Sequence, residues 1–146
     1  MTIRGILFTG LAWLVPLVGS TVATACPLEQ SVYRDAAKRG FTLEFSPPSS
    51  DSMVPVAAAE LRHAQRGKIF SFEVTQSNGY GTYHLSRTDS PKSSLAIYFF
   101  DANLQSIGPD AAALAFVADL GAADHYDTRN KPSVGDAMWR LERCKK

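Results

Sequence analysis

The sequence lacks an excess of either charge. Its 146 residues carry 15 lysines and arginines against 14 aspartates and glutamates, which gives a formal net charge of +1. Nucleic acids and anionic membrane surfaces are bound through clusters of basic residues, and the chain has no basic stripe. Neither class of partner is therefore expected.

Signature motifs of common enzymes are also missing. The chain contains no G-x-S-x-G, no S-x-x-K and no H-E-x-x-H, the local patterns of several hydrolases and of zinc proteases. A phosphate-binding glycine loop would need a helix directly after it, whereas Gly79-Tyr80-Gly81 precedes strand-like residues. The sequence predicts no metal site and no cofactor.

Long apolar runs are absent except near the amino terminus. Arg4 precedes an apolar run over residues 6–18, and an A-x-A cleavage pattern follows at residues 23–25. This is the layout of a secretory signal peptide, and the run is shorter than the ~20 residues of a membrane span. We expect residues 1–25 to be removed on export, and residues 26–146 to form one β-rich domain that is periplasmic or secreted.

Cysteine is scarce, with only Cys26 and Cys144 in the chain. In an oxidising compartment, an even pair of cysteines is interpreted first as a disulfide. The bridge would join the two ends of the exported domain. The alternative is lipidation of Cys26, as in bacterial lipoproteins, which would leave Cys144 unpaired.

Alternation of apolar and polar residues predicts most of the fold. The pattern is clearest at residues 68–77, where Phe70, Phe72 and Val74 would face the core. Further strands are expected over residues 41–45, 56–63, 80–87, 95–100 and 135–144. The segment 95–100 is apolar on both faces, which is typical of a strand covered on each side.

A single helix is predicted near residues 109–120, because Pro109 suits a first helical turn, alanine dominates and Gly121 can end the helix. Residues 28–40 fit either an amphipathic helix or a hairpin, and their Val-Tyr pair favours the hairpin. The expected fold is mainly β with this one helix. Its antiparallel meander of six or seven strands would curl into a small barrel or sandwich.

A hairpin is predicted at QSNGYGTYHL, residues 76–85. A two-residue type I′ turn at Asn78-Gly79 would place Val74 opposite Tyr83. The same register would bring apolar pairs together on one face of the sheet, so turn chemistry and hydrophobicity agree.

That register also suggests a catalytic pair, because it places Glu73 opposite His84. A carboxylate that orients an imidazole is part of many general-base arrangements. The alternative is an ordinary cross-strand polar pair.

His125, between Asp124 and Asp127, is a second weak candidate, since a loop after the helix could hold catalytic groups. The spacing of these residues matches no dedicated zinc motif.

Tyrosine near the hairpin tip suggests a contact surface. Asn78 and Tyr80 would lie at the tip, and a tyrosine side chain offers area and a hydrogen bond at low entropic cost. The alternative is that these aromatics belong to the core.

The layout of a leader followed by a small β-rich body, with Gly40 before the strand FTLEF (41–45), resembles periplasmic lysozyme inhibitors. The likeness is confined to that short stretch, and no inhibitory loop can be matched, so no functional residue is carried over. The sequence favours an exported envelope protein that acts without catalysis, as a binding or inhibitor-like domain for a protein or small ligand. The alternative is a small periplasmic hydrolase that uses a His/carboxylate pair.

Overall fold

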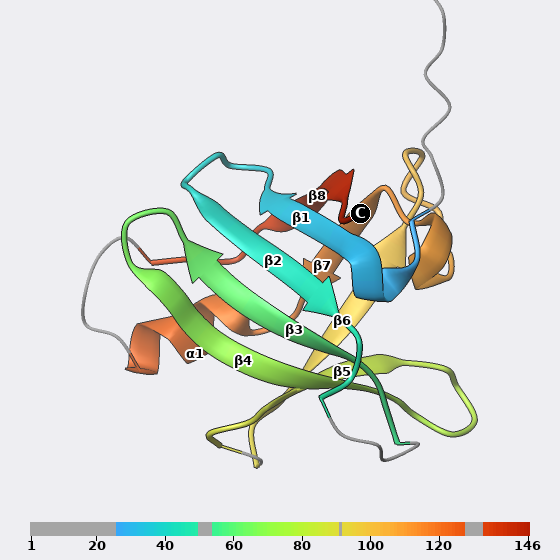
Figure 1. Ribbon diagram of the computed structural model, residues 1–146, viewed down its shortest axis with the longest axis horizontal. Helices are drawn as coiled ribbons and strands as arrows, with labels where there is room; N and C mark the ends of the chain where they lie inside the picture. Colours follow the sequence, from blue (N-terminus) through green and yellow to red (C-terminus); the bar gives the residue numbers. More distant parts are fainter. Residues whose placement is uncertain (1–25, 50–53, 91, 128–132) are drawn as a thin grey trace, which may run out of the picture.

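The computed structural model describes residues 26–49, 54–90, 92–127 and 133–146, so the expected leader at residues 1–25 lies outside the described residues. Eight antiparallel strands follow one another around a closed barrel, each paired with its neighbours in sequence, and β1 pairs with β8 to complete the ring (Figure 1). The strands are β1 (Ser31–Asp35), β2 (Phe41–Ser46), β3 (Pro55–His63), β4 (Gly67–Gln76), β5 (Tyr83–Arg87), β6 (Ser94–Phe100), β7 (Leu114–Val117) and β8 (Met138–Cys144). The expected class, a mainly β meander curled into a barrel, is confirmed, with eight strands rather than six or seven.

Short helical segments cover the two ends of this barrel. The 3-10 turns η1 (Leu28–Gln30) and η2 (Pro109–Ala111) lie at the end where the β4–β5 loop and the β6–β7 connection also meet (Figure 1). We call this end the mouth. The helix α1 (Leu120–Asp127) lies at the opposite end (Figure 1). Within the described residues, no helix is long and apolar enough to cross a membrane.

The barrel interior is filled by aromatic and aliphatic side chains. The alternating burial of β2 and β3 sends every second residue inward, as the sequence pattern predicted. Tyr33, Phe45 and Phe99 pack with ring centroids 5.9–6.4 Å apart, and Trp139 from β8 is 1% exposed. An eight-stranded barrel is just wide enough for its own side chains to fill. The architecture is therefore a packed core rather than a container.

The helix expected near residues 109–120 is in the wrong place. The segment begins with the 3-10 turn η2, continues as strand β7 between β6 and β8, and becomes helical only at Leu120. Ala115 is fully buried in β7. Alanine prefers helix, but this preference is worth only a few tenths of a kcal/mol per residue and is outweighed by two hydrogen-bonded ladders and a buried face.

The predicted hairpin forms, but with a longer turn and a shifted register. Val74 pairs with Leu85 rather than with Tyr83, and Ser77 N–H donates to Thr82 O at 2.8 Å around a four-residue loop. The cause is Gly81, which has a φ of +73° and supplies a second left-handed position beyond Gly79. A shift of two residues keeps each side chain on its predicted face while changing every partner.

Two further predictions have clear outcomes. Residues 28–40 form the hairpin of β1 and β2, preceded by the turn η1, so the helical alternative is wrong. Strand β6 is not covered on both faces: Tyr98 points outward with 46% of its surface exposed. It pairs with Phe116, which pairs with Met138, so an apolar row crosses the outer wall of β6, β7 and β8.

Candidate functional site

A pocket of about 400 Å³ opens at the mouth of the barrel. It lies between the β4–β5 loop, the end of β6 and the β6–β7 connection. Its lining residues are Gln76, Tyr80, Gly81, Thr82, Tyr83, Ile97, Tyr98, Phe99, Ser106, Ile107 and Gly108. We call this the mouth pocket. Its volume falls within the roughly 300–1,000 Å³ that is usual for small-molecule sites.

The pocket exists because the β5–β6 ladder stops early. The last pair of this ladder is Tyr83 with Ile97, whereas β6 continues to Phe100. The β6–β7 connection folds back along the remaining part of β6, where Ile107 N–H donates to Phe99 O at 3.1 Å. The space between this fold-back and the β4–β5 loop is the mouth pocket.

A tight turn holds the fold-back in place. The carboxylate of Asp101 accepts hydrogen bonds from the backbone N–H groups of Asn103 (2.8 Å) and Gln105 (2.9 Å). Leu104 between them takes a left-handed φ of +64°, which costs energy for a residue with a side chain. Aspartate favours such turns because its carboxylate reaches the backbone two residues on.

The opposite wall is the loop that carries Tyr80. Gly79 and Gly81 have φ values of +107° and +73°, which a residue with a Cβ rarely adopts. Gln76 Nε2 donates to Gly81 O at 3.4 Å and ties the loop back to β4. Tyr80 is 98% exposed at the tip, next to Asn78, as expected from the sequence.

The chemistry of the mouth pocket is aromatic and uncharged. Tyr83 stacks edge-to-face on Phe99 with centroids 5.6 Å apart. Apart from the tyrosine hydroxyls, the lining contains no ionisable side chain. Burial, reinforced by the nearby carboxylate of Asp110, raises the pKa of the Tyr83 hydroxyl. Tyr83 is therefore a neutral hydrogen-bonding group at physiological pH.

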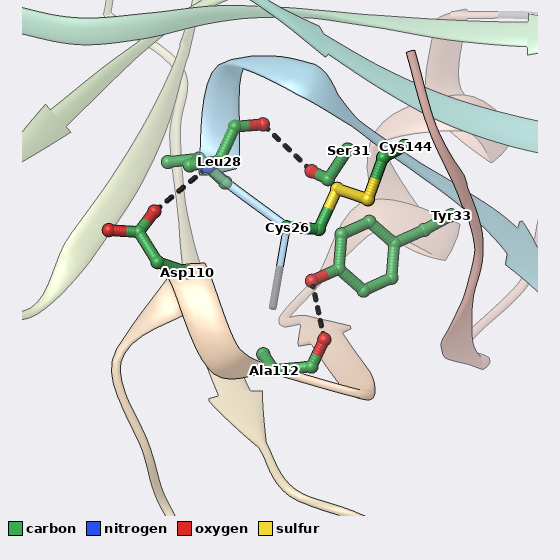
Figure 2. Close-up of a disulfide and its surroundings, with 7 residues drawn as sticks. All are labelled: Cys26, Leu28, Ser31, Tyr33, Asp110, Ala112 and Cys144. Atoms are coloured by element: carbon green, nitrogen blue, oxygen red, sulfur yellow. Dashed lines mark hydrogen bonds between the residues drawn. A yellow bond between two sulfur atoms is a disulfide. The ribbon is translucent and has the colours of Figure 1, made fainter. Parts of the chain in front are cut away.

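A disulfide and two hydrogen bonds hold the residues next to one wall of this pocket (Figure 2 shows the disulfide). Cys26 and Cys144 are bonded, with Cα atoms 5.8 Å apart, which confirms the predicted bridge. The bridge ties the residues before η1 to the end of β8, and two hydrogen bonds join them to η2: Leu28 N–H donates to Asp110 Oδ1 and Cys26 N–H donates to Asp110 O, both at 2.9 Å (Figure 2 shows the first of these bonds). Because Asp110 follows Gly108 by two residues, the segment from Cys26 to Leu28 anchors one wall of the pocket.

The predicted catalytic pair of Glu73 and His84 is not brought together as expected. Glu73 pairs with Ser86, and His84 lies opposite Thr75 on one side and Ala96 on the other. Within the described residues, no hydrogen bond or ion pair joins Glu73 to His84. The two-residue register shift at the turn accounts for this difference.

His125 lies on α1 rather than in a loop, exposed to solvent, with its ring 5.8 Å from that of Tyr126. Its neighbour Asp124 points the other way. The buried carboxylate of Asp124 pairs with Arg66 Nη2 at 3.2 Å and accepts the Val134 N–H at 2.7 Å. Asp124 therefore ties α1 to the barrel end and does not orient His125.

His63 is the third histidine, and it is a structural residue. Its buried ring packs on Phe41 with centroids 4.5 Å apart. Nδ1 accepts the backbone N–H groups of Gln65 (3.2 Å) and Arg66 (3.3 Å), and Nε2 lies 3.1 Å from Arg39 O. Because Nδ1 accepts these bonds, the ring is neutral and carries its proton on Nε2. The ring packs at the barrel end away from the mouth.

A larger groove of about 520 Å³, with charged residues in its lining, lies on the outer wall of β1, β2 and β3. Its charged residues are of both signs, and two of them are already paired. Arg62 Nη1 contacts Glu60 Oε2 at 2.7 Å, and Arg34 pairs with Glu142. Such exposed pairs contribute little energy and define no single ligand charge. The smaller mouth pocket is therefore the better candidate site.

Of the two contact residues that the sequence predicts, Tyr80 lines the mouth pocket and Asn78 does not. The sequence gives no sign of the second wall, formed by Ser106, Ile107 and Gly108. A fold-back of a connection onto its own strand leaves no periodic pattern.

The fold and the site together define a closed eight-stranded meander barrel with an uncharged, tyrosine-rich pocket at its mouth. Among the described residues, no group of three or more His, Cys, Asp and Glu side chains is placed to hold a metal ion. Comparisons with known proteins find no match to a family model, a curated protein or a solved structure.

Proposed function

We propose that this protein is an exported, non-catalytic binding domain of the cell envelope, which recognises a protein or small ligand at the mouth pocket. One observation carries the proposal: the exposed rings of Tyr80 and Tyr98 flank the pocket where the β5–β6 ladder ends. A concave site with apolar rings and a few polar groups is the usual form of a binding site.

Export is supported by the bridge between Cys26 and Cys144. Disulfides persist in oxidising compartments, so the bridge fits a protein outside the cytoplasm. The signal-like residues 1–25 favour the periplasm or the exterior as that compartment. In the bridged form, the Cys26 sulfur is bonded to Cys144 and cannot carry a lipid. An intact mass of the exported protein, before and after reduction, distinguishes the two fates.

Binding at the mouth is tested with the ¹⁵N-labelled protein exported from its full-length precursor. Indole, benzyl alcohol and cyclohexanol serve as small uncharged probes. We expect amide shifts to concentrate in residues 76–83, 97–99 and 106–108, and to weaken in the Tyr80→Ala variant.

Tyr126→Ala is the matched control, because Tyr126 is also highly exposed, at 84%, but lies on α1 at the far end of the barrel. This variant should leave the shifts unchanged. Shifts clustered in the groove on β1, β2 and β3 would contradict the proposal.

The competing hydrolase function predicts a different outcome. Saturable hydrolysis of p-nitrophenyl acetate that is abolished by His84→Ala, and retained in His125→Ala, would replace the binding proposal. Glu73 and His84 are not directly paired across β4 and β5, and among the described residues no hydrogen bond joins them, which argues against it.

A further inference from the structure

We infer that the ligand of the mouth pocket is an uncharged sugar ring, bound with its C–H face on an exposed tyrosine and its hydroxyls toward the polar rim. This inference rests on the proposed binding function and names the chemical class of the ligand. Three properties of the pocket support it: its lack of charge, its pattern of polar groups and the position of its tyrosines.

The first property is electrostatic. Within the described residues that line the pocket, there is no Asp, Glu, Lys, Arg or His side chain. The carboxylate of Asp110, two residues beyond Gly108, is not among the lining groups and accepts the Leu28 N–H. Its charge is felt at Tyr83, and it would repel an anion brought into the pocket. Phosphate groups and acidic sugars are therefore disfavoured.

The second property is the mixture of polar and apolar groups. Ile107, which is 40% exposed, and the tyrosine rings provide apolar surface, while Gln76, Thr82 and Ser106 add an amide and two hydroxyls. A purely apolar ligand would displace water from these polar groups without replacing its hydrogen bonds, which is costly. A sugar ring carries hydroxyls around its edge and can replace them.

The third property is the arrangement of the tyrosines. Tyr80 belongs to the β4–β5 loop and Tyr98 to the outer wall of β6, and both are exposed while lining the same pocket. The face of an aromatic ring is electron-rich and attracts the weakly positive C–H groups of a sugar. Tyr83 is less exposed, stacks on Phe99 and offers its hydroxyl from within the pocket.

The test is an NMR titration of the exported protein with N,N′-diacetylchitobiose and maltotriose as neutral probes. Trigalacturonate is the acidic counterpart. We expect saturable shifts at the mouth with at least one neutral probe, and at least tenfold weaker binding of trigalacturonate. Tyr80→Ala and Tyr98→Ala should each weaken neutral binding about tenfold, as expected for loss of one stacked ring. Tyr126→Ala should leave it unchanged.

A co-sedimentation assay with purified insoluble chitin separates two sources of the same chemistry. Protein that binds the soluble probes and also sediments with chitin recognises polymeric glycan, whereas binding of the soluble probes alone indicates a free sugar. Both outcomes support the inference.

Failure of this inference is distinguishable from failure of the binding proposal. If indole or cyclohexanol shifts the mouth residues while neither neutral sugar does, the sugar assignment is wrong and the binding site stands. Equal or tighter binding of trigalacturonate would also overturn the assignment. If no probe shifts the mouth residues, both proposals fail.

Discussion

Removing the disulfide is expected to cost a large share of the stability of this protein. The bridge from Cys26 to Cys144 closes a loop with a sequence separation of 118 residues. On the chain-entropy model, opening a loop of this length destabilises the folded state by about 5 kcal/mol. A domain of this size has a total stability of about 5–15 kcal/mol, so the double variant Cys26→Ala/Cys144→Ala should be marginally stable or unfolded.

A local effect should accompany the global one. Without the bridge, η1 is held at the mouth by the buried side chain of Leu28 and by the hydrogen bonds of the Cys26 and Leu28 amides to Asp110. Each such bond contributes about 1 kcal/mol, which is comparable to the cost of ordering one residue of backbone. The wall of the mouth pocket near Gly108 should loosen, and probe binding at the mouth should weaken even where the barrel remains folded.

Urea unfolding measures the effect. Trp139 is the only tryptophan outside residues 1–25 and is buried in the core, so its fluorescence reports the barrel. With a slope of about 1.5–2 kcal/mol per molar urea, the midpoint should fall by roughly 2.5–3.5 M in the double variant. Reduction of the unmodified protein is the control and should give the same shift. A loss below about 1 kcal/mol would refute the loop-entropy reasoning.

Three further predictions concern the core and the end of the barrel away from the mouth. Asp124→Ala should lower the free energy of unfolding by about 3 kcal/mol because it leaves the largely buried Arg66 without its carboxylate, and a double-mutant cycle with Arg66→Ala should show strong coupling. Gly121→Ala should cost about 1–3 kcal/mol, since the added Cβ would lie 2.6 Å from the Gly135 carbonyl carbon, whereas Gly108→Ala, where a Cβ meets nothing within 4 Å, should change stability by less than about 0.5 kcal/mol. Burial raises the pKa of Tyr33 in the folded state, so its contribution to stability is complete below pH ~10 and declines above it as the unfolded chain loses the phenol proton. Tyr33→Phe should flatten the fall in urea midpoint between about pH 9.5 and 11.5, and an unchanged slope would contradict this.

The strands of this barrel could be predicted because every second side chain of a strand faces the apolar core. Residues 41–45 and 70–75 alternate without exception, and no helix could bury the same side chains on one face. The disulfide was predictable for a different reason, since two cysteines allow only one intramolecular pairing.

The errors have a common physical origin in tertiary context. Strand β7 has a helix-like, alanine-rich sequence, and only the gap between β6 and β8 makes it extended. The register of the β4–β5 hairpin depended on whether Gly81 or Asn78 took the second left-handed position, and two-residue and four-residue loops both satisfy the local pattern. That single difference separated Glu73 from His84.

The outer wall gave a signal that was interpreted in the wrong way. Strand β6 is apolar on both faces, which indicated a covered central strand. In a closed barrel, every strand is central, and the outer face is open unless another element packs on it. The row from Tyr98 through Phe116 to Met138 therefore adds apolar surface beside the mouth pocket.

The closure of the barrel has a consequence for how the chain folds. Seven of the eight ladders join strands that are consecutive in sequence, and only the pairing of β1 with β8 spans the whole domain. Pairings between distant segments form slowly because a long loop must be ordered first. When Cys26 and Cys144 are already bonded, these two strands begin close together, and the slowest contact becomes a short-range one. Early formation of the bridge would therefore accelerate folding as well as stabilise the finished barrel.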